Sequence, residues 1–126
     1  MGTTLAIVER ALRGTVEQQY AHVLWLVSGL HRQSPMIVLL RGAATVYALD
    51  APTPAPTVLG SVPWGVSADY CEALERLHAG GAAVLVSATS LDQLGLADRP
   101  MLPCVDIVTD DQIATVAVGC DRIWFL

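Results

Sequence analysis

Small polar side chains follow an apolar run near the middle of the chain, and they are the first candidates for chemistry. The run covers residues 82–86, and Ser87, Thr89 and Ser90 come directly after it. An apolar run of this length is typical of a strand buried on both faces of a sheet. In open parallel sheets, ligands bind just beyond the carboxyl ends of strands, so these residues lie where a site is expected. A plain strand-to-helix turn gives the same pattern, and that interpretation stays open.

Ser90 is predicted to cap a short helical turn that closes at Gly95. A Ser87 nucleophile would need a histidine base at a geometry that spacing does not define. The local sequence SATSL also lacks the glycines of a nucleophile elbow. The three histidines, His22, His31 and His78, are interpreted as surface or packing residues, and His31 ends a helix, where a cation is favourable.

The three cysteines, Cys71, Cys104 and Cys120, match no zinc or redox spacing, and no metal or cofactor is predicted. Cys104 and Cys120 precede predicted strands, so we expect both at the amino edge of the sheet as packing residues. Cys71 falls in the first turns of a predicted helix that starts on the carboxyl side, where the helix dipole favours a thiolate. It is therefore the one cysteine with a candidate chemical role, and packing is the alternative.

An anion or a polar small molecule is the ligand that the nearby basic residues suggest. Gly14 comes before Thr15 and a predicted helix, an arrangement that binds anions. Arg13 and Arg41 are expected near the same edge. No dinucleotide-binding or Walker motif is present, which disfavours nucleotides. The predicted pocket is lined by Arg13, Gly14, Arg41, Gly42, Ser87, Ser90 and Gly95, with Trp64 added from the preceding loop.

Apolar runs and turn signals predict the elements that position these residues. Strands are expected at 3–8, 36–40, 82–86, 105–108 and 122–125, and helices at 15–30, 43–49, 68–78 and 110–118. Their alternation predicts a three-layer α/β/α sandwich with a five-stranded, mostly parallel sheet, in a single domain over residues 1–126. Residues 51–63 hold four prolines and are predicted to form an extended surface loop, of the kind often used as a lid or binding segment.

Composition narrows the class of partner. The chain has 126 residues and a net charge of −5, and its basic residues are seven scattered arginines. The absence of a basic stripe disfavours nucleic acid. Only 15% of residues are charged and 53% are apolar, which favours burial of surface in a homo- or hetero-oligomer. The apolar stretch at 21–30 is too short to span a bilayer, and the N-terminus lacks the features of a signal peptide, so a cytoplasmic location is expected.

Four stretches resemble the DsrE/DsrF-like family of sulfur-relay proteins. They are GTVEQQYAHVLWLVSGL at 14–30, MIVLLRGAATVYAL at 36–49, AAVLVSATSLDQLGL at 82–96 and IVTDDQIATVAVGCDRIWFL at 107–126. The resemblance implies trimers or hexamers, often formed by pairing related DsrE-like subunits, and contact with sulfur-carrier proteins. In some members a cysteine at the end of the central strand carries sulfane sulfur as a persulfide, and a glycine follows eight residues later.

The sequence departs from the family at that cysteine. The position eight before Gly95 is Ser87. A persulfide requires a thiolate, and a serine hydroxyl cannot hold sulfane sulfur. We therefore expect a non-catalytic or regulatory subunit. The alternative is a sulfurtransferase or persulfide carrier that uses a displaced cysteine, Cys71.

Overall fold

The computed structural model describes residues 2–9, 27, 29–50, 57–64 and 70–126. The predicted first helix lies outside these residues, apart from Val27 and residues 29–30, which are helical. Its predicted Thr15 cap and His22 are therefore outside the described chain.

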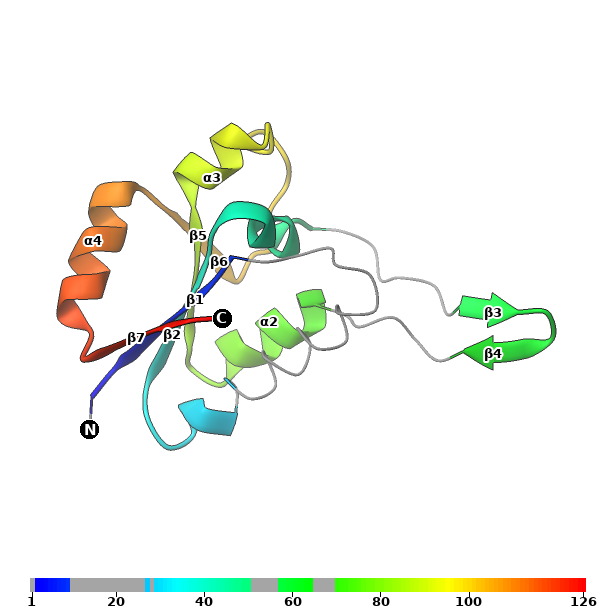
Figure 1. The fold of residues 1–126 in the computed structure, drawn as a ribbon, viewed down its shortest axis with the longest axis horizontal. Helices are drawn as coiled ribbons and strands as arrows, with labels where there is room; N and C mark the ends of the chain where they lie inside the picture. The colour runs from blue at the N-terminus through cyan, green and yellow to red at the C-terminus, as the bar shows by residue number, and fades with distance from the viewer. Residues whose placement is uncertain (1, 10–26, 28, 51–56, 65–69) are drawn as a thin grey trace.

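Five parallel strands form the sheet at the centre of the molecule (Figure 1). Their spatial order is β6-β5-β2-β1-β7, and each pairs in parallel with its neighbours. The predicted five-stranded sheet is confirmed, because apolar runs without alternation suit strands that are covered on both faces. The strands are β1 (Thr4–Val8), β2 (Met36–Leu40), β5 (Ala83–Ser87), β6 (Val105–Val108) and β7 (Arg122–Phe125).

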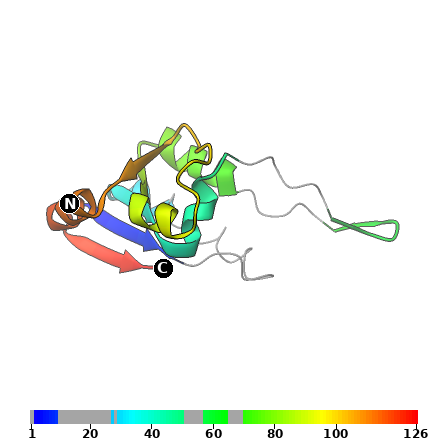
Figure 2. The ribbon, with the colours of Figure 1, turned by 90° about the horizontal axis from the view of Figure 1, so that it is seen from above.

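Helices cover the two faces of this sheet, which makes the three predicted layers (Figures 1 and 2). The helix α2 (Tyr70–Ala79) and the 3-10 helix η2 (Gly42–Ala48) pack with the larger apolar core on one face. The helix α4 (Asp110–Gly119) packs on the other face, over a smaller core. The smaller core consists of Leu5, Ile7, Leu39, Leu85 and Val108, which the strand register places on one side of the sheet.

Local signals in the sequence account for the helix ends. Thr109 caps α4 as predicted, because its hydroxyl accepts the Gln112 N–H while the Gln112 side chain accepts the Thr109 N–H. In α2, Leu74 and Leu77 are buried at the three-residue spacing of an inward face. The predicted helix at 43–49 is the 3-10 helix η2.

The prediction of an extended surface loop over residues 51–63 is wrong for the second half of this segment, which forms two strands. Residues 57–64 form a hairpin of β3 (Thr57–Leu59) and β4 (Val62–Trp64), joined by a two-residue turn. Gly60 has φ 64°, a conformation that such turns require and that glycine adopts at little energetic cost. Three of the four prolines lie before β3, at residues 52, 54 and 56. The count over the whole segment therefore predicted a loop although Thr57 and Val58, which are β-branched, favour a strand. The hairpin stands apart from the five-stranded sheet (Figure 1).

Candidate functional site

Ser87 lies at the carboxyl edge of the sheet, at the end of β5, which is the second strand from one side of the sheet and not its central strand. This residue is the last of β5 and is 2% exposed, and the helix α3 (Ala88–Gln93) begins directly after it. Its Oγ accepts the backbone N–H of Ser90 at 3.2 Å. Ser87 is therefore the N-cap of α3. The predicted cap at Ser90 is wrong, because the helix starts without a connecting loop and Ser90 is already its third residue.

Ser90 joins this strand end to the end of the neighbouring strand. Its Oγ accepts the backbone N–H of Gly42 at 3.0 Å, and Gly42 opens η2 after β2. Gly42 has φ 53°, and a Cβ placed on it would lie 3.4 Å from the Glu9 carbonyl oxygen. A hydrogen-bonded chain thus runs from Gly42 through Ser90 to Ser87, and it brings together three residues of the predicted pocket.

Arg41 directly precedes Gly42, and its positive charge is paired with the Glu9 carboxylate. Its guanidinium is 3.4 Å from the Glu9 carboxylate, and both side chains are about half exposed, at 46% and 47%. An exposed pair of this kind contributes little to stability, and it lowers the positive charge that an anion would meet. The predicted anion site therefore has a carboxylate at its edge.

The other predicted pocket residues take no part in the hydrogen bonds that join Gly42, Ser90 and Ser87. Arg13 and Gly14 lie outside the described residues, and so does the side chain of Trp64, which ends β4. Gly95 follows α3, where its N–H donates to the Asp92 carbonyl. Whether these residues line one pocket with Ser87 stays a prediction.

The chemistry open to Ser87 is limited by its surroundings. Among the described residues, its one hydrogen bond is with the Ser90 N–H, and neither a histidine nor a carboxylate contacts its hydroxyl. A serine nucleophile needs an adjacent base to remove its proton. In the described part of the chain, Ser87 has the geometry of a helix cap rather than of an activated nucleophile.

No two of the three cysteines form a disulfide. Cys71 is the second residue of α2 and is half-buried, and its Sγ donates to the Leu49 carbonyl at 3.6 Å. Only a protonated thiol can make that contact. Cys104 precedes β6 and Cys120 follows α4, and burial raises the pKa of each thiol. A raised pKa keeps these thiols protonated and weakly nucleophilic at neutral pH.

His31 has a structural role that differs from the predicted helix-end cation. Its Nδ1 accepts the Met36 N–H at 3.0 Å, and its Nε2 lies 3.0 Å from the Gly80 carbonyl oxygen. An accepting Nδ1 and a donating Nε2 define the neutral Nε2–H tautomer. The ring therefore links the turn before β2 to the end of α2.

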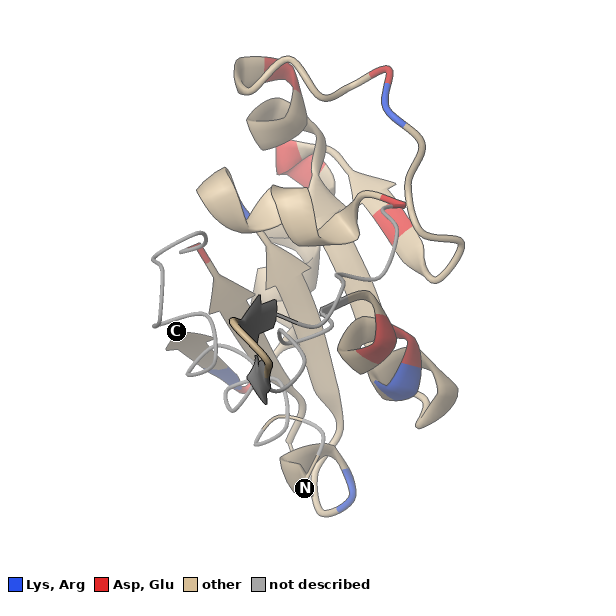
Figure 3. Cartoon of the chain, turned by 90° about the vertical axis from the view of Figure 1, so that its right-hand side faces the viewer, with Lys and Arg blue, Asp and Glu red and all other residues tan. Residues whose placement is uncertain are grey.

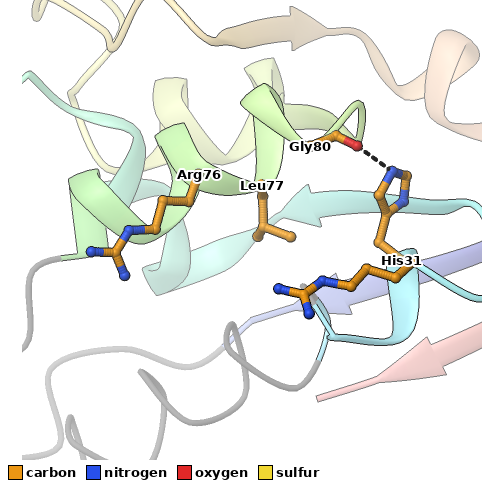
Figure 4. A pocket seen from close by; sticks show the side chains of 5 residues that line it. His31, Arg76, Leu77 and Gly80 are labelled. Atoms are coloured by element: carbon orange, nitrogen blue, oxygen red, sulfur yellow. Dashed lines mark hydrogen bonds between the residues drawn. The ribbon is translucent and has the colours of Figure 1, made fainter.

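The ring of His31 also borders a groove of about 530 Å³ (Figure 4). The groove lies near the amino ends of β2 and β5, whereas Ser87 is the last residue of β5. Arg76 pairs with Glu72, so part of the positive charge at this groove is neutralised within α2. Elsewhere in the described chain the arginines stand singly (Figure 3). The groove is lined by His31, Arg32, Arg76, Leu77 and Gly80. Its residues are far apart in sequence, and no sequence signal indicated them.

A second hollow, of about 390 Å³, lies between α4 and the sheet. Its floor is apolar and its wall includes a carboxylate. We call it the α4 hollow, and it is lined by Leu85, Val108, Asp111, Gln112, Thr115 and Val116. The sequence did not indicate it, because it is formed by three elements that meet only in the fold.

In the described part of the chain, no group of three or more His, Cys, Asp or Glu side chains could hold a metal ion. None of the described helices is long and apolar enough to cross a membrane.

Comparison with known proteins supports the fold. No protein-family model and no curated protein matches the chain. Among solved structures, the YchN protein of Escherichia coli superposes with a TM-score of 0.78 at 19% sequence identity, over 100% of both chains. YchN has a DsrE-like fold. This chain therefore has the DsrE-like α/β fold, with five parallel strands between two layers of helices.

Proposed function

We propose that this chain is a non-catalytic or regulatory subunit of a DsrE-like sulfur-relay assembly. The observation that carries the proposal is the identity and geometry of Ser87. It ends β5, the strand whose end would carry the sulfur-bearing cysteine according to the family resemblance. Its hydroxyl is buried and bonded to the Ser90 N–H. A hydroxyl in this position cannot form a persulfide.

The surroundings of Ser87 suit a former thiolate site. The Ser90 N–H points at the Oγ of Ser87, and the same donor would meet a sulfur atom placed there. A hydrogen bond donated to the charged form of a group favours that form. The site therefore has a donor that a sulfur atom could use and holds a serine oxygen in that place, which supports a role in assembly rather than in sulfur transfer.

Mass spectrometry tests this proposal on the native protein. After incubation with a sulfane-sulfur donor, we expect no gain of about 32 Da, the mass of one sulfur atom, on any peptide. A Ser87→Ala variant is the matched control, since it should behave as the native protein does. An adduct on a native cysteine would contradict the proposal.

The second candidate function is a sulfurtransferase-type persulfide carrier that uses Cys71. The observation in its favour is the position of Cys71 in the first turn of α2, half-buried. Against it stands the donation of its thiol proton to the Leu49 carbonyl. A sulfur adduct that appears on native protein and is lost in Cys71→Ser would establish this function instead.

The partners proposed for the subunit are copies of itself, in a trimer or hexamer, or related DsrE-like subunits, and a sulfur-carrier protein. Large apolar side chains exposed on the described surface support association: Leu94, Ile107, Val118, Ile123 and Phe125. We place the assembly in the cytoplasm, where the cysteine thiols would stay reduced.

A further inference from the structure

Two arginines that are far apart in the sequence line one groove on the described surface. Arg32 follows His31 in the turn before β2, and Arg76 lies near the end of α2. The groove has a volume of about 530 Å³, and its described lining includes no acidic side chain. The chain has seven arginines and a net charge of −5, so two arginines at one groove form a local exception on an acidic protein.

The two arginines differ in how far their charge is already paired. Arg32 is exposed and takes part in no ion pair among the described residues. Arg76 pairs with Glu72 of the preceding turn of α2, and these two side chains are 73% and 53% exposed. An exposed pair of this kind contributes little free energy. A ligand with a stronger negative charge can therefore replace the Glu72 carboxylate at Arg76.

The carbonyl groups at the end of α2 have hydrogen-bond donors of their own. Unpaired carbonyls give a helix C-terminus a negative potential, which disfavours anions. Here the carbonyls of Arg76, Leu77 and His78 accept the backbone N–H groups of residues 80–82. The Gly80 carbonyl accepts from His31 Nε2 at 3.0 Å. The negative potential at this helix end is thereby reduced, and the arginines are the charged groups that a ligand in the groove meets.

His31 fixes the two walls of the groove relative to each other. Arg76 and Leu77 project from α2, and His31 projects from the helical segment that precedes β2 (Figure 4). The ring of His31 is hydrogen-bonded both to the Gly80 carbonyl, which follows α2, and to the Met36 N–H, which starts β2. The groove is thus formed without a ligand, which lowers the entropic cost of binding.

We infer that this groove binds a phosphate group through the guanidinium groups of Arg32 and Arg76. Two guanidinium groups offer more N–H donors than the two oxygens of one carboxylate can use. A dianionic phosphate matches both positive charges, and its oxygens suit the planar fork of arginine. Free phosphate and a small phosphorylated molecule both supply this group. The site lies near the amino end of β5, away from Ser87, and it goes beyond the proposed function, which involves no anion.

Titration of the full chain with inorganic phosphate and with phenyl phosphate tests this site. Backbone amide NMR shifts are recorded at about pH 7.5, where the phosphate group is mainly dianionic, and sodium chloride keeps the ionic strength constant. We expect saturable shifts at Leu77 and Gly80. In Arg32→Gln and in Arg76→Gln the dissociation constant should rise about tenfold, because each variant loses a charge-assisted hydrogen bond. Arg99→Gln is the matched control, since Arg99 is exposed and does not line the groove.

A Glu72→Gln variant tests the competition at Arg76. Loss of the competing carboxylate should lower the dissociation constant, by up to about fivefold for an exposed pair. Glu75→Gln is its control, because it removes the same charge from an exposed position of α2 that forms no ion pair with Arg76 among the described residues. The amide spectrum of each variant also checks that it is folded.

Tighter binding of phenyl phosphate would identify a phosphorylated molecule as the ligand, and equal binding of both probes would identify free phosphate. Three results would overturn the inference: no saturable shifts, equal affinity of the native protein and Arg32→Gln, or shifts at Gly42 and Ser90 in place of those at the groove. A sulfur adduct on the native protein would overturn the proposed function and leave this titration unchanged.

Discussion

The backbone N–H of Ser90 donates to the Oγ of Ser87 at 3.2 Å, so one serine both ends β5 and caps the helix that follows. A residue with two structural roles is constrained without any catalytic role. Its burial and its single described hydrogen bond determine how much stability the protein should lose when Ser87 is replaced.

Replacing Ser87 by alanine should destabilise the fold modestly. The variant Ser87→Ala removes the cap of α3, and lost caps of this kind cost about 1 kcal/mol. Thr89→Ala is the control, because Thr89 is exposed in the same helix. Urea unfolding measures both. Equal stability of the two variants would show that the Ser87 contact does not stabilise α3.

Burial explains why the strands could be predicted and the cap could not. The run Met36–Leu40 is apolar throughout because both sides of β2 are covered, and such a run is visible in sequence. Ser87 and Ser90 are both suitable caps. What decides between them is the pairing of Ser87 with Val108, which keeps residue 87 in the sheet.

Contacts between residues that are far apart in the sequence could not be predicted from the sequence either. The bond between His31 and the Gly80 carbonyl joins residues 49 positions apart, and neither has a local signal for the other. The α4 hollow has the same origin, since α4 meets β5 and β6 only in the folded sheet. Of the predicted pocket, the sequence placed Gly42, Ser87 and Ser90 at one edge, and the hydrogen bonds join them there.

The Ser90→Ala variant should lower the free energy of unfolding. Ser90 is 7% exposed, and its loss leaves the Gly42 N–H without its acceptor. A fully buried donor without a partner costs about 1–3 kcal/mol, and because Gly42 is half-buried we expect a loss of about 1 kcal/mol. The same urea experiment applied to the double variant should also show that the stability losses of Ser87→Ala and Ser90→Ala are not additive, since both hydrogen bonds involve Ser90. Additive effects would mean that the two bonds act independently.

Gly42→Ala should destabilise the protein by about 1–2 kcal/mol, because φ 53° places a Cβ against the backbone. Gly119→Ala is the matched control: a Cβ on Gly119 meets nothing within 4 Å, and the residue is helical. Thermal unfolding compares the two. If Gly42→Ala is as stable as the control, the left-handed conformation at residue 42 is not required.

The thiols of Cys104 and Cys120 should react slowly at neutral pH. Burial raises the pKa of both, so a smaller fraction is thiolate than in a free cysteine. In a Cys71→Ser variant, the rate of labelling by a thiol reagent should rise at a higher pH in the folded protein than in the same protein unfolded in urea. The stabilising effect of the protonated thiols is complete below about pH 8.5 and is lost as the pH rises through the higher folded pKa. Coincident pH profiles would contradict this.

The central claim is that Ser87 occupies a sulfur-bearing position and has no sulfur chemistry of its own. The most direct measurement compares native protein with Ser87→Cys after incubation with a sulfane-sulfur donor, by mass spectrometry of the peptide that carries residue 87. Serine and cysteine are similar in size, and the Ser90 N–H would be placed to donate to the new sulfur. We predict a gain of about 32 Da on the variant and none on the native protein. A folded Ser87→Cys protein whose thiol stays unmodified, or a native protein that takes up sulfur on Cys71, would contradict the claim.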